Sequence, residues 1–131
     1  MNTTNNGKKF RSALGSFATG VTIVTSAAED GAPVGVTASS FNSVSLDPPL
    51  VLWSLAKSSL SRRIFCDSGH FAIHVLAARQ EQLSNSFAKS GEDKFGDVAW
   101  SAGSLGSPLI DDYAALFQCR TVHQYEGGDH I

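Results

Sequence analysis

The stretch from Gly35 to Trp53, GVTASSFNSVSLDPPLVLW, constrains the fold of this chain more than any other segment. From residue 34 to residue 39, apolar residues alternate with small or polar ones, which is the pattern of a β-strand with one face in a core. Five hydroxyl residues and one amide occupy nine consecutive positions: Thr37, Ser39, Ser40, Asn42, Ser43 and Ser45. Small hydroxyls and exposed backbone N–H groups suit an anionic or heterocyclic ligand, and a serine-rich edge without a ligand is the alternative.

Several other segments have the composition of strands separated by turns. Residues 21–25 are β-branched throughout, and the turn residues Glu29, Asp30 and Gly31 follow, which predicts an antiparallel hairpin with the strand at 34–38. Apolar runs predict further strands at 50–55, 71–76 and 114–125, with 50–55 in a central position. A short strand at 98–100 is expected within a long loop at 89–112.

Only short helices are indicated between these strands. Apolar residues at helical spacing predict helices at 9–18, 59–65 and 79–88, with Gly20 ending the first and Ser58 as the N-cap of the second. Hairpin connections and short helices favour a mainly β fold, an antiparallel barrel with peripheral helices. A doubly wound parallel sheet would require long crossover helices instead.

The composition bounds the size, assembly and location of the protein. A chain of 131 residues fits one domain, here residues 10–131 behind a polar, disordered lead at 1–9. Only 17% of the residues are charged, so we expect a partner subunit to cover part of the surface. The net charge of −2 gives no reason to expect nucleic acid or an anionic membrane. Without a signal peptide or an apolar span, and with Cys66 far from Cys119, we expect a cytoplasmic protein without a disulfide framework.

Six motifs follow one another along the chain. They are FRSALGSFATGVTIVT from Phe10, GVTASSFNSVSLDPPLVLW from Gly35, KSS from Lys57, FAIHVL from Phe71, DKF from Asp93 and GGDH from Gly127. Together they resemble the flavin reductase family with the FMN-binding split-barrel fold. The resemblance implies a homodimeric split β-barrel that binds FMN or FAD and reduces it with NADH or NADPH. Many members of that family supply the reduced flavin to a separate monooxygenase.

The resemblance also implies roles for particular residues. The flavin ring and ribityl chain would be lined by backbone N–H groups and hydroxyls of Thr37, Ala38, Ser39 and Ser40. A phosphate would lie at a helix N-terminus beside Lys57, Ser58 and Ser59, where Ser58 also serves as a simple cap in the alternative interpretation. Ser54 either faces the flavin or is satisfied by the backbone. His130 would be the catalytic residue near the nicotinamide, and an ordinary surface histidine is the alternative.

Two features depart from the family pattern. His74 stands where family members usually have Asn. The sequence ends at Ile131, where family members continue with an apolar strand, so we expect a barrel without its closing strand.

His70 and His74 share no helical face, and no metal site is expected. Phe95 in DKF stacks on a ligand ring or anchors its loop. Two further function classes remain open, a flavin carrier or sensor of the same fold and a structural dimer without a ligand.

Overall fold

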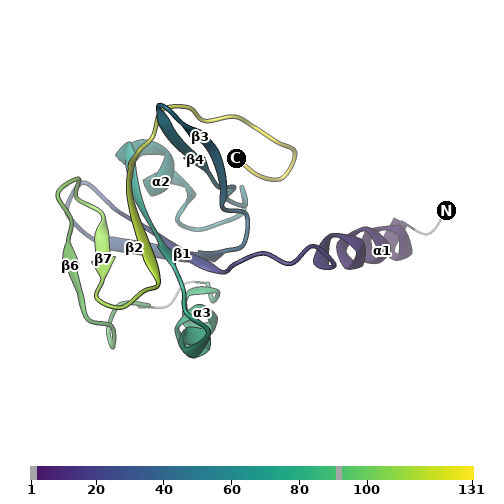
Figure 1. Cartoon of the computed structure of the whole chain (residues 1–131), viewed down its shortest axis with the longest axis horizontal. Helices are drawn as coiled ribbons and strands as arrows, with labels where there is room; N and C mark the ends of the chain where they lie inside the picture. The colour runs from purple at the N-terminus through teal and green to yellow at the C-terminus, as the bar shows by residue number, and fades with distance from the viewer. Residues whose placement is uncertain (1–2, 91–92) are drawn as a thin grey trace.

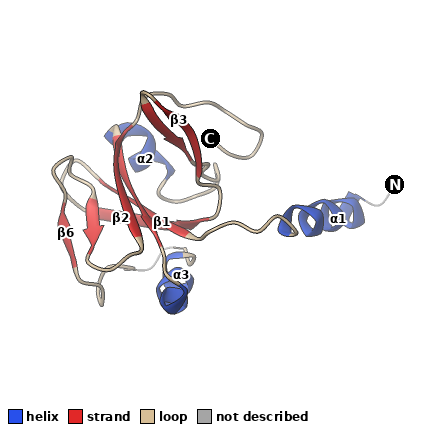
Figure 2. Ribbon diagram, viewed as in Figure 1, coloured by secondary structure: helices blue, strands red, loops and turns tan. Residues whose placement is uncertain are grey.

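A computed structural model describes residues 3–90 and 93–131, which form a mainly β structure with a few short helices (Figures 1 and 2). Its strands are β1 (Thr22–Ala27), β2 (Pro33–Ala38), β3 (Asn42–Leu46), β4 (Pro49–Leu52), β5 (His70–Val75), β6 (Trp100–Ala102), β7 (Pro108–Ile110) and β8 (Ala115–Arg120). The helices are α1 (Thr3–Gly15), α2 (Arg62–Ser68) and α3 (Glu81–Phe87), with a 3-10 turn η1 (Ala78–Gln80) before α3. None of the helices in the described ranges is long and apolar enough to cross a membrane.

The β1–β2 hairpin forms one side of the main sheet, and its prediction from the sequence is confirmed. The strands pair antiparallel, with Val24 opposite Val36. At the turn, Gly31 has a φ of 90°, a value that favours glycine, and Asp30 Oδ1 accepts the N–H of Ala32 at 3.0 Å. β5 pairs with the other edge of β1, and β8 pairs with β5. The strand order β2-β1-β5-β8 leaves β2 at one edge of the sheet.

Two hydrophobic clusters pack against the two faces of this sheet. β1 is buried along its whole length, and the adjacent residues Ile23 and Val24 point to opposite faces because side chains alternate along a strand. The first cluster consists of Ile23, Phe87, Phe95 and Ile110, and brings in α3 and β7. The second consists of Val24, Leu55, Phe65 and Ile73, and brings in α2. The sheet is therefore the middle layer of the molecule (Figure 1).

Helix α1 differs in its bounds from the helix predicted at 9–18. It begins at Thr3, so residues 3–9 are helical rather than a disordered lead, while residues 1 and 2 lie outside the described ranges. It ends at Gly15, five residues before Gly20, because an earlier glycine already weakens the helix there. α1 projects away from the sheet (Figure 1), and its apolar side chains Phe10 and Leu14 are 68% and 59% exposed, as is Phe17 just after the helix, at 77%.

Other boundaries were predicted wrongly, because periodicity and composition do not reveal which strand pairs with which or where that pairing stops. The expected central strand at 50–55 is β4, which ends at Leu52 and, among the described strands, pairs with β3 alone. α2 begins at 62, and Ser61 rather than Ser58 is its N-cap, without a side-chain capping bond. β8 ends at Arg120, because its partner β5 begins at His70 and no strand in the described ranges continues the pairing. The loop at 89–112 contains the β6–β7 hairpin in place of a strand at 98–100.

The strands of the described residues belong to three separate sheets. These are the four-stranded sheet and the two-stranded pairs β3–β4 and β6–β7. The sheets do not close on one another in the described ranges, so the expected mainly β fold is confirmed without the closure that a barrel requires. The predicted strand β5 and the predicted helix at 79–88 are confirmed, the latter as η1 and α3 with Phe87 fully buried.

Candidate functional site

The free edge of β2 borders a cleft of about 510 Å³. The segment from Trp53 to Ser61 forms a second side, and the end of α3 with the residues after it forms a third. A cleft of this size lies within the range of small-molecule and cofactor sites. Eight of the nine site residues expected from the sequence line it: Thr37, Ala38, Ser39, Ser40, Ser54, Ser58, Ser59 and His130.

Alternate residues of β2 direct their backbone groups toward this edge. In an antiparallel pair, only every second residue hydrogen-bonds to the partner strand. The turn bond from Ala28 N–H to Ala32 O, at 2.9 Å, fixes the even-numbered residues of β2 as those that bond to β1. The N–H and C=O of Gly35 and Thr37 therefore face away from β1, and Gly35 O indeed accepts a bond from Lys94. A ligand beside β2 would meet the Thr37 N–H.

Two hydroxyls that were expected to contact a ligand are bonded within the protein. Thr37 Oγ1 donates to Ser84 O in α3 at 2.6 Å. Ser40 Oγ donates to Ser54 O at 3.2 Å and accepts the Ser54 N–H at 2.8 Å. Thr37 thus fastens β2 to α3, and Ser40 fastens the end of β2 to the opposite side of the cleft. Both hydroxyls hold the walls in place, which leaves mainly backbone groups of these residues for a ligand.

Serines dominate the side of the cleft that leads into α2. Ser58, Ser59 and Ser61 all line it, and Ser59 Oγ accepts the Ser61 N–H at 3.2 Å in the turn before the helix. Lys57 is the one expected site residue that does not line the cleft. Its Nζ lies 3.6 Å from Glu126 Oε1 instead.

His130 reaches the cleft because residues 127–131 run beside the segment at 55–57. Leu55 N–H donates to Ile131 O at 2.7 Å, and Ile131 N–H donates to Leu55 O at 2.8 Å. His130 Nδ1 lies 2.8 Å from Asp129 Oδ1, and this hydrogen bond lowers the pKa of Asp129. With Nδ1 held by the carboxylate, the Nε2 atom of His130 is the ring nitrogen left for a ligand.

Lys94 lies on the third side of the cleft; it belongs to the DKF motif but was not among the site residues expected from the sequence. Lys94 Nζ donates to Gly35 O and to Phe87 O, each at 2.9 Å, and burial lowers the pKa of Lys94. A lysine in a glycine-bounded loop carries no pattern that separates it from a solvated one. The neighbouring Phe95 is buried against Phe87, with ring centroids 5.1 Å apart, as the loop-anchoring alternative predicted.

The two histidines of β5 have partners away from the cleft. His74 is fully buried, its Nδ1 bonded to Ile23 O at 3.0 Å while its Nε2 accepts the Ile110 N–H at 3.0 Å. His70 Nδ1 lies 2.5 Å from Ser107 Oγ. Within the described ranges, no group of three or more His, Cys, Asp or Glu side chains is arranged to hold a metal ion.

The groups around the cleft define the ligand that it suits. The lining supplies hydroxyls, strand-edge backbone groups, the fixed ammonium of Lys94 and the ring of His130, with Asp93 as the acidic side chain. The Asp93 carboxylate turns back into its own loop, where Oδ1 accepts the Phe95 N–H at 3.2 Å. This donor-rich lining fits a ligand with a flat hydrogen-bonding ring along β2 and an anionic group at the serines.

Comparison with known proteins places the chain among flavin enzymes. The family model of the flavin reductase like domain matches residues 14–131. The chain is 46% identical to the reductase component of the flavin-dependent trigonelline monooxygenase of Acinetobacter baylyi, over 99% of this chain and 42% of that protein. It is 50% identical to the FMN reductase (NADH) SmoA of Agrobacterium fabrum, over 95% of this chain and 71% of that protein. The structure of the Streptomyces globisporus NADH:FAD oxidoreductase SgcE6 with NAD and FAD fragments superposes with a TM-score of 0.89 and 40% identity, over 96% of this chain and 76% of that one.

Proposed function

Because the chain belongs to the flavin reductase family, we propose that it binds FMN or FAD in the cleft beside β2 and reduces it with NADH or NADPH. One observation carries this proposal: a free strand edge, a row of serines and His130 border a single cleft of about 510 Å³. The chain spans 42% of the length of the first relative named above and 71% of the second. Because the relatives contain further residues, we infer the activity from the cleft of this chain and not from their names.

Different residues of the cleft would bind different parts of the flavin. The Thr37 N–H and the neighbouring strand edge would hold the ring, since edge N–H and C=O groups match a heterocycle with alternating donors and acceptors. The hydroxyls of Ser58 and Ser59, in the turn before α2, would bind the phosphate. Ser40 and Ser54 keep these two sides at a fixed spacing through their mutual hydrogen bonds. Lys57, which pairs with Glu126, would act on the phosphate only through its charge.

A bound flavin would supply the hydride acceptor, its N5 atom, and the nicotinamide would supply the hydride with its electron pair from C4. The chain contributes orientation and exclusion of water rather than a nucleophile. His130 borders the cleft beside Ala56 and is held by Asp129, so it would orient the nicotinamide or stabilise charge on the reduced ring. We therefore assign His130 the role of catalytic residue within this proposal.

The proposal is tested by mixing the purified protein with FMN or FAD, and then with NADH or NADPH, in a stopped-flow instrument. Rapid loss of the oxidised flavin absorbance on the protein, faster than with free flavin, is the expected result. Flavin binding without reduction by either nucleotide would favour a carrier or sensor. No flavin binding at all would overturn the proposal.

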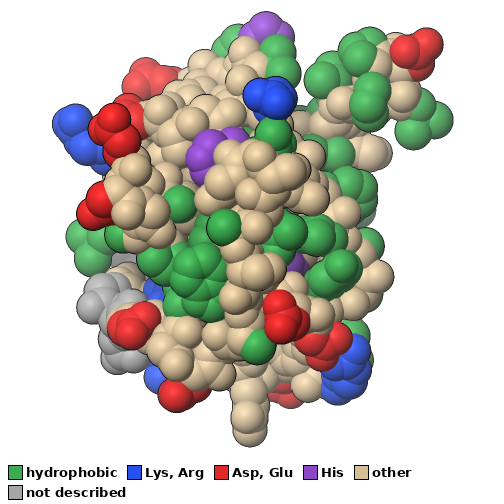
Figure 3. Space-filling model, turned by 90° about the vertical axis from the view of Figure 1, so that its left-hand side faces the viewer, with side chains coloured by type: hydrophobic (Ala, Val, Ile, Leu, Met, Phe, Trp, Pro, Cys, Tyr) green, Lys and Arg blue, Asp and Glu red, His purple; other side chains and the backbone are tan. Residues whose placement is uncertain are grey.

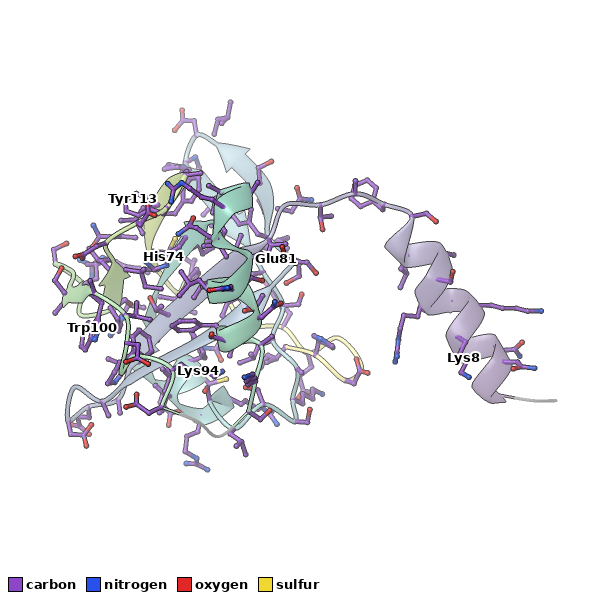
Figure 4. All side chains as sticks on the ribbon, turned by 90° about the horizontal axis from the view of Figure 1, so that it is seen from below. Lys8, His74, Glu81, Lys94, Trp100 and Tyr113 are labelled. Carbon is purple, nitrogen blue, oxygen red and sulfur yellow. The ribbon has the colours of Figure 1, made fainter. Side chains whose placement is uncertain are left out.

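We also propose that the three sheets complete a single-domain split barrel, residues 10–131, in a homodimer. α1 carries an exposed apolar stripe but projects away from its own sheet, and an isolated helix of 13 residues is marginal in water (Figure 4). The β3–β4 pair also exposes apolar side chains, above all Leu46 at 94%. A second copy of the chain would cover both.

The charges of α1 and of the remaining chain are complementary. α1 carries Lys8, Lys9 and Arg11 and no acidic residue, whereas the other 7 basic residues share the rest of the chain with all 12 acidic ones, a net charge of −5 there. On the face shown in Figure 3, charges of both signs are scattered among apolar and polar groups. Sedimentation velocity of the full chain should show a dimer. A folded monomer at micromolar concentration would refute the homodimer.

A separate monooxygenase is the proposed recipient of the reduced flavin. The support is that several relatives are named as reductase components or subunits of flavin-dependent monooxygenases. Coupled product formation, with the reductase and a candidate oxygenase mixed, tests this part of the proposal.

A further inference from the structure

Lys94 joins two elements that are distant in sequence and border the same cleft. Its ammonium donates to Gly35 O on the free edge of β2 and to Phe87 O at the last residue of α3, both at 2.9 Å. Figure 4 shows Lys94 beside this end of α3, with Glu81 toward the other end. A cation is favoured at a helix C-terminus, where carbonyl groups are left without intrahelical partners. The position of the ammonium is therefore fixed by the protein before any ligand binds.

The charge of Lys94 is not neutralised in the described part of the chain. The ion pairs there are Lys57 with Glu126, Arg79 with Asp112 and His130 with Asp129, and none includes Lys94. The neighbouring carboxylate of Asp93 is turned toward the Phe95 N–H. Both acceptors of Lys94 are neutral carbonyl groups, and an ammonium has three donors. Within the described ranges, one N–H and the positive charge of Lys94 remain for a partner.

Half-burial makes an unpaired ammonium unfavourable, because charges removed from water are normally paired. Lys94 is half-buried and borders the cleft. An anionic group bound there would provide the missing partner. The serine side at 58–61 lies on a different side of the cleft, so the cleft has two separate places that favour an anion.

We propose that Lys94 is a positioning residue that pairs with an anionic group of the bound cofactor or co-substrate at the β2–α3 side of the cleft. This inference rests on the proposed function. The anion has two possible sources, the negative charge that the flavin ring carries once reduced, and a phosphate of the nicotinamide dinucleotide. Both would accept the third N–H of the ammonium.

Lys94→Met tests the inference because it keeps most of the stem and removes the charge. Lys89→Met is the matched control, since Lys89 borders the same side of the cleft but is exposed and has no bond to β2. Three quantities are measured for both variants and the original chain: the dissociation constant of FMN, that of NAD⁺ on the FMN-loaded protein, and the midpoint potential of bound FMN.

If the anion is a phosphate of the dinucleotide, Lys94→Met should weaken NAD⁺ binding about 10- to 100-fold and leave the potential of FMN unchanged. If the anion is the reduced ring, the potential should fall, with reduced FMN losing about 10- to 100-fold more affinity than oxidised FMN, and NAD⁺ binding should be unchanged. Lys89→Met should change none of these quantities by more than about twofold.

Unchanged NAD⁺ affinity and unchanged potential in a folded Lys94→Met variant would overturn the inference and leave Lys94 as a purely structural bridge. If the Lys94→Met variant does not fold, the inference is tested on the original chain, whose lysines are acetylated and whose rate of labelling at each lysine is measured by mass spectrometry. Saturating FMN with NAD⁺, or reduced FMN, should slow labelling of Lys94 more than of Lys89. Equal labelling with and without ligands would refute the inference. Failure of the original chain to bind FMN would instead refute the proposed function.

Discussion

Gly35→Ala should destabilise the protein through a single added methyl group. A Cβ at position 35 would lie 2.7 Å and 2.8 Å from two ring carbons of Phe87, and 3.2 Å from Phe95. The shortest of these distances is about 0.8 Å below the ~3.5 Å at which carbon atoms make favourable contact. Phe87 is fully buried and packs edge-on against Phe95, so its ring has little room to move aside.

The cost of this clash can be estimated from the behaviour of other packed cores. Overpacking by one methyl group costs about 1–3 kcal/mol, and the lower chain entropy of unfolded alanine offsets about 0.4–1 kcal/mol of that. A net loss of about 1–2 kcal/mol corresponds to a fall in Tm of about 3–10 °C for a chain of this size. Because the Thr37 N–H on the same strand is the proposed contact of the flavin ring, the displaced strand should also weaken flavin binding.

Gly20→Ala is the matched control, because no atom lies within 4 Å of a Cβ built there and its φ is not positive. It should change stability by no more than about 0.5–1 kcal/mol, and in the stabilising direction if at all. Thermal unfolding followed by circular dichroism compares the two variants with the original chain. Equal Tm values for Gly35→Ala and Gly20→Ala would refute the packing argument.

Three further substitutions test the buried histidine and the cleft. Burial lowers the pKa of His74 in the folded chain, so the unfolded chain binds a proton at this histidine more readily. The contribution of neutral His74 to the free energy of unfolding is therefore fully present above the ordinary pKa of about 6.5. It declines by up to about 1.4 kcal/mol per pH unit as the pH falls below that value. His74→Asn should remove this part of the slope in urea unfolding at a series of pH values, and an unchanged slope would assign it to other groups. Changing Ser58 and Ser59 together to Ala should weaken FMN by at least about tenfold and riboflavin much less, because only FMN has a phosphate to lose; equal losses in fluorescence titrations would place the phosphate elsewhere. His130→Ala should slow single-turnover flavin reduction about 10²- to 10⁴-fold with nearly unchanged FMN affinity, and an unchanged rate and KM would remove His130 from the site.

The sequence pattern was sufficient to predict those elements whose structure depends on residues close together in the chain. The β1–β2 hairpin follows from β-branched residues on either side of the Asp30-Gly31 turn, and the structure places its polar edge on the cleft. α3 follows from the spacing of Leu83 and Phe87, which both pack into the first cluster. The ordered motifs indicated the family, and the family model matches residues 14–131.

The sequence by itself thus indicated the family and the strands of the hairpin, and eight of the nine residues that it proposed for the site line one cleft. Only the tertiary structure shows which groups those residues bond to and which other residues lie beside them at the cleft. Ser40 bonds to Ser54 across 14 residues, and Lys94 bonds to Gly35 across 59. Periodicity records only which face of an element is apolar, whereas the partner of a hydroxyl or an ammonium depends on where the chain returns in space. The charge of Lys94 therefore becomes part of the site only when the fold brings α3 against the free edge of β2.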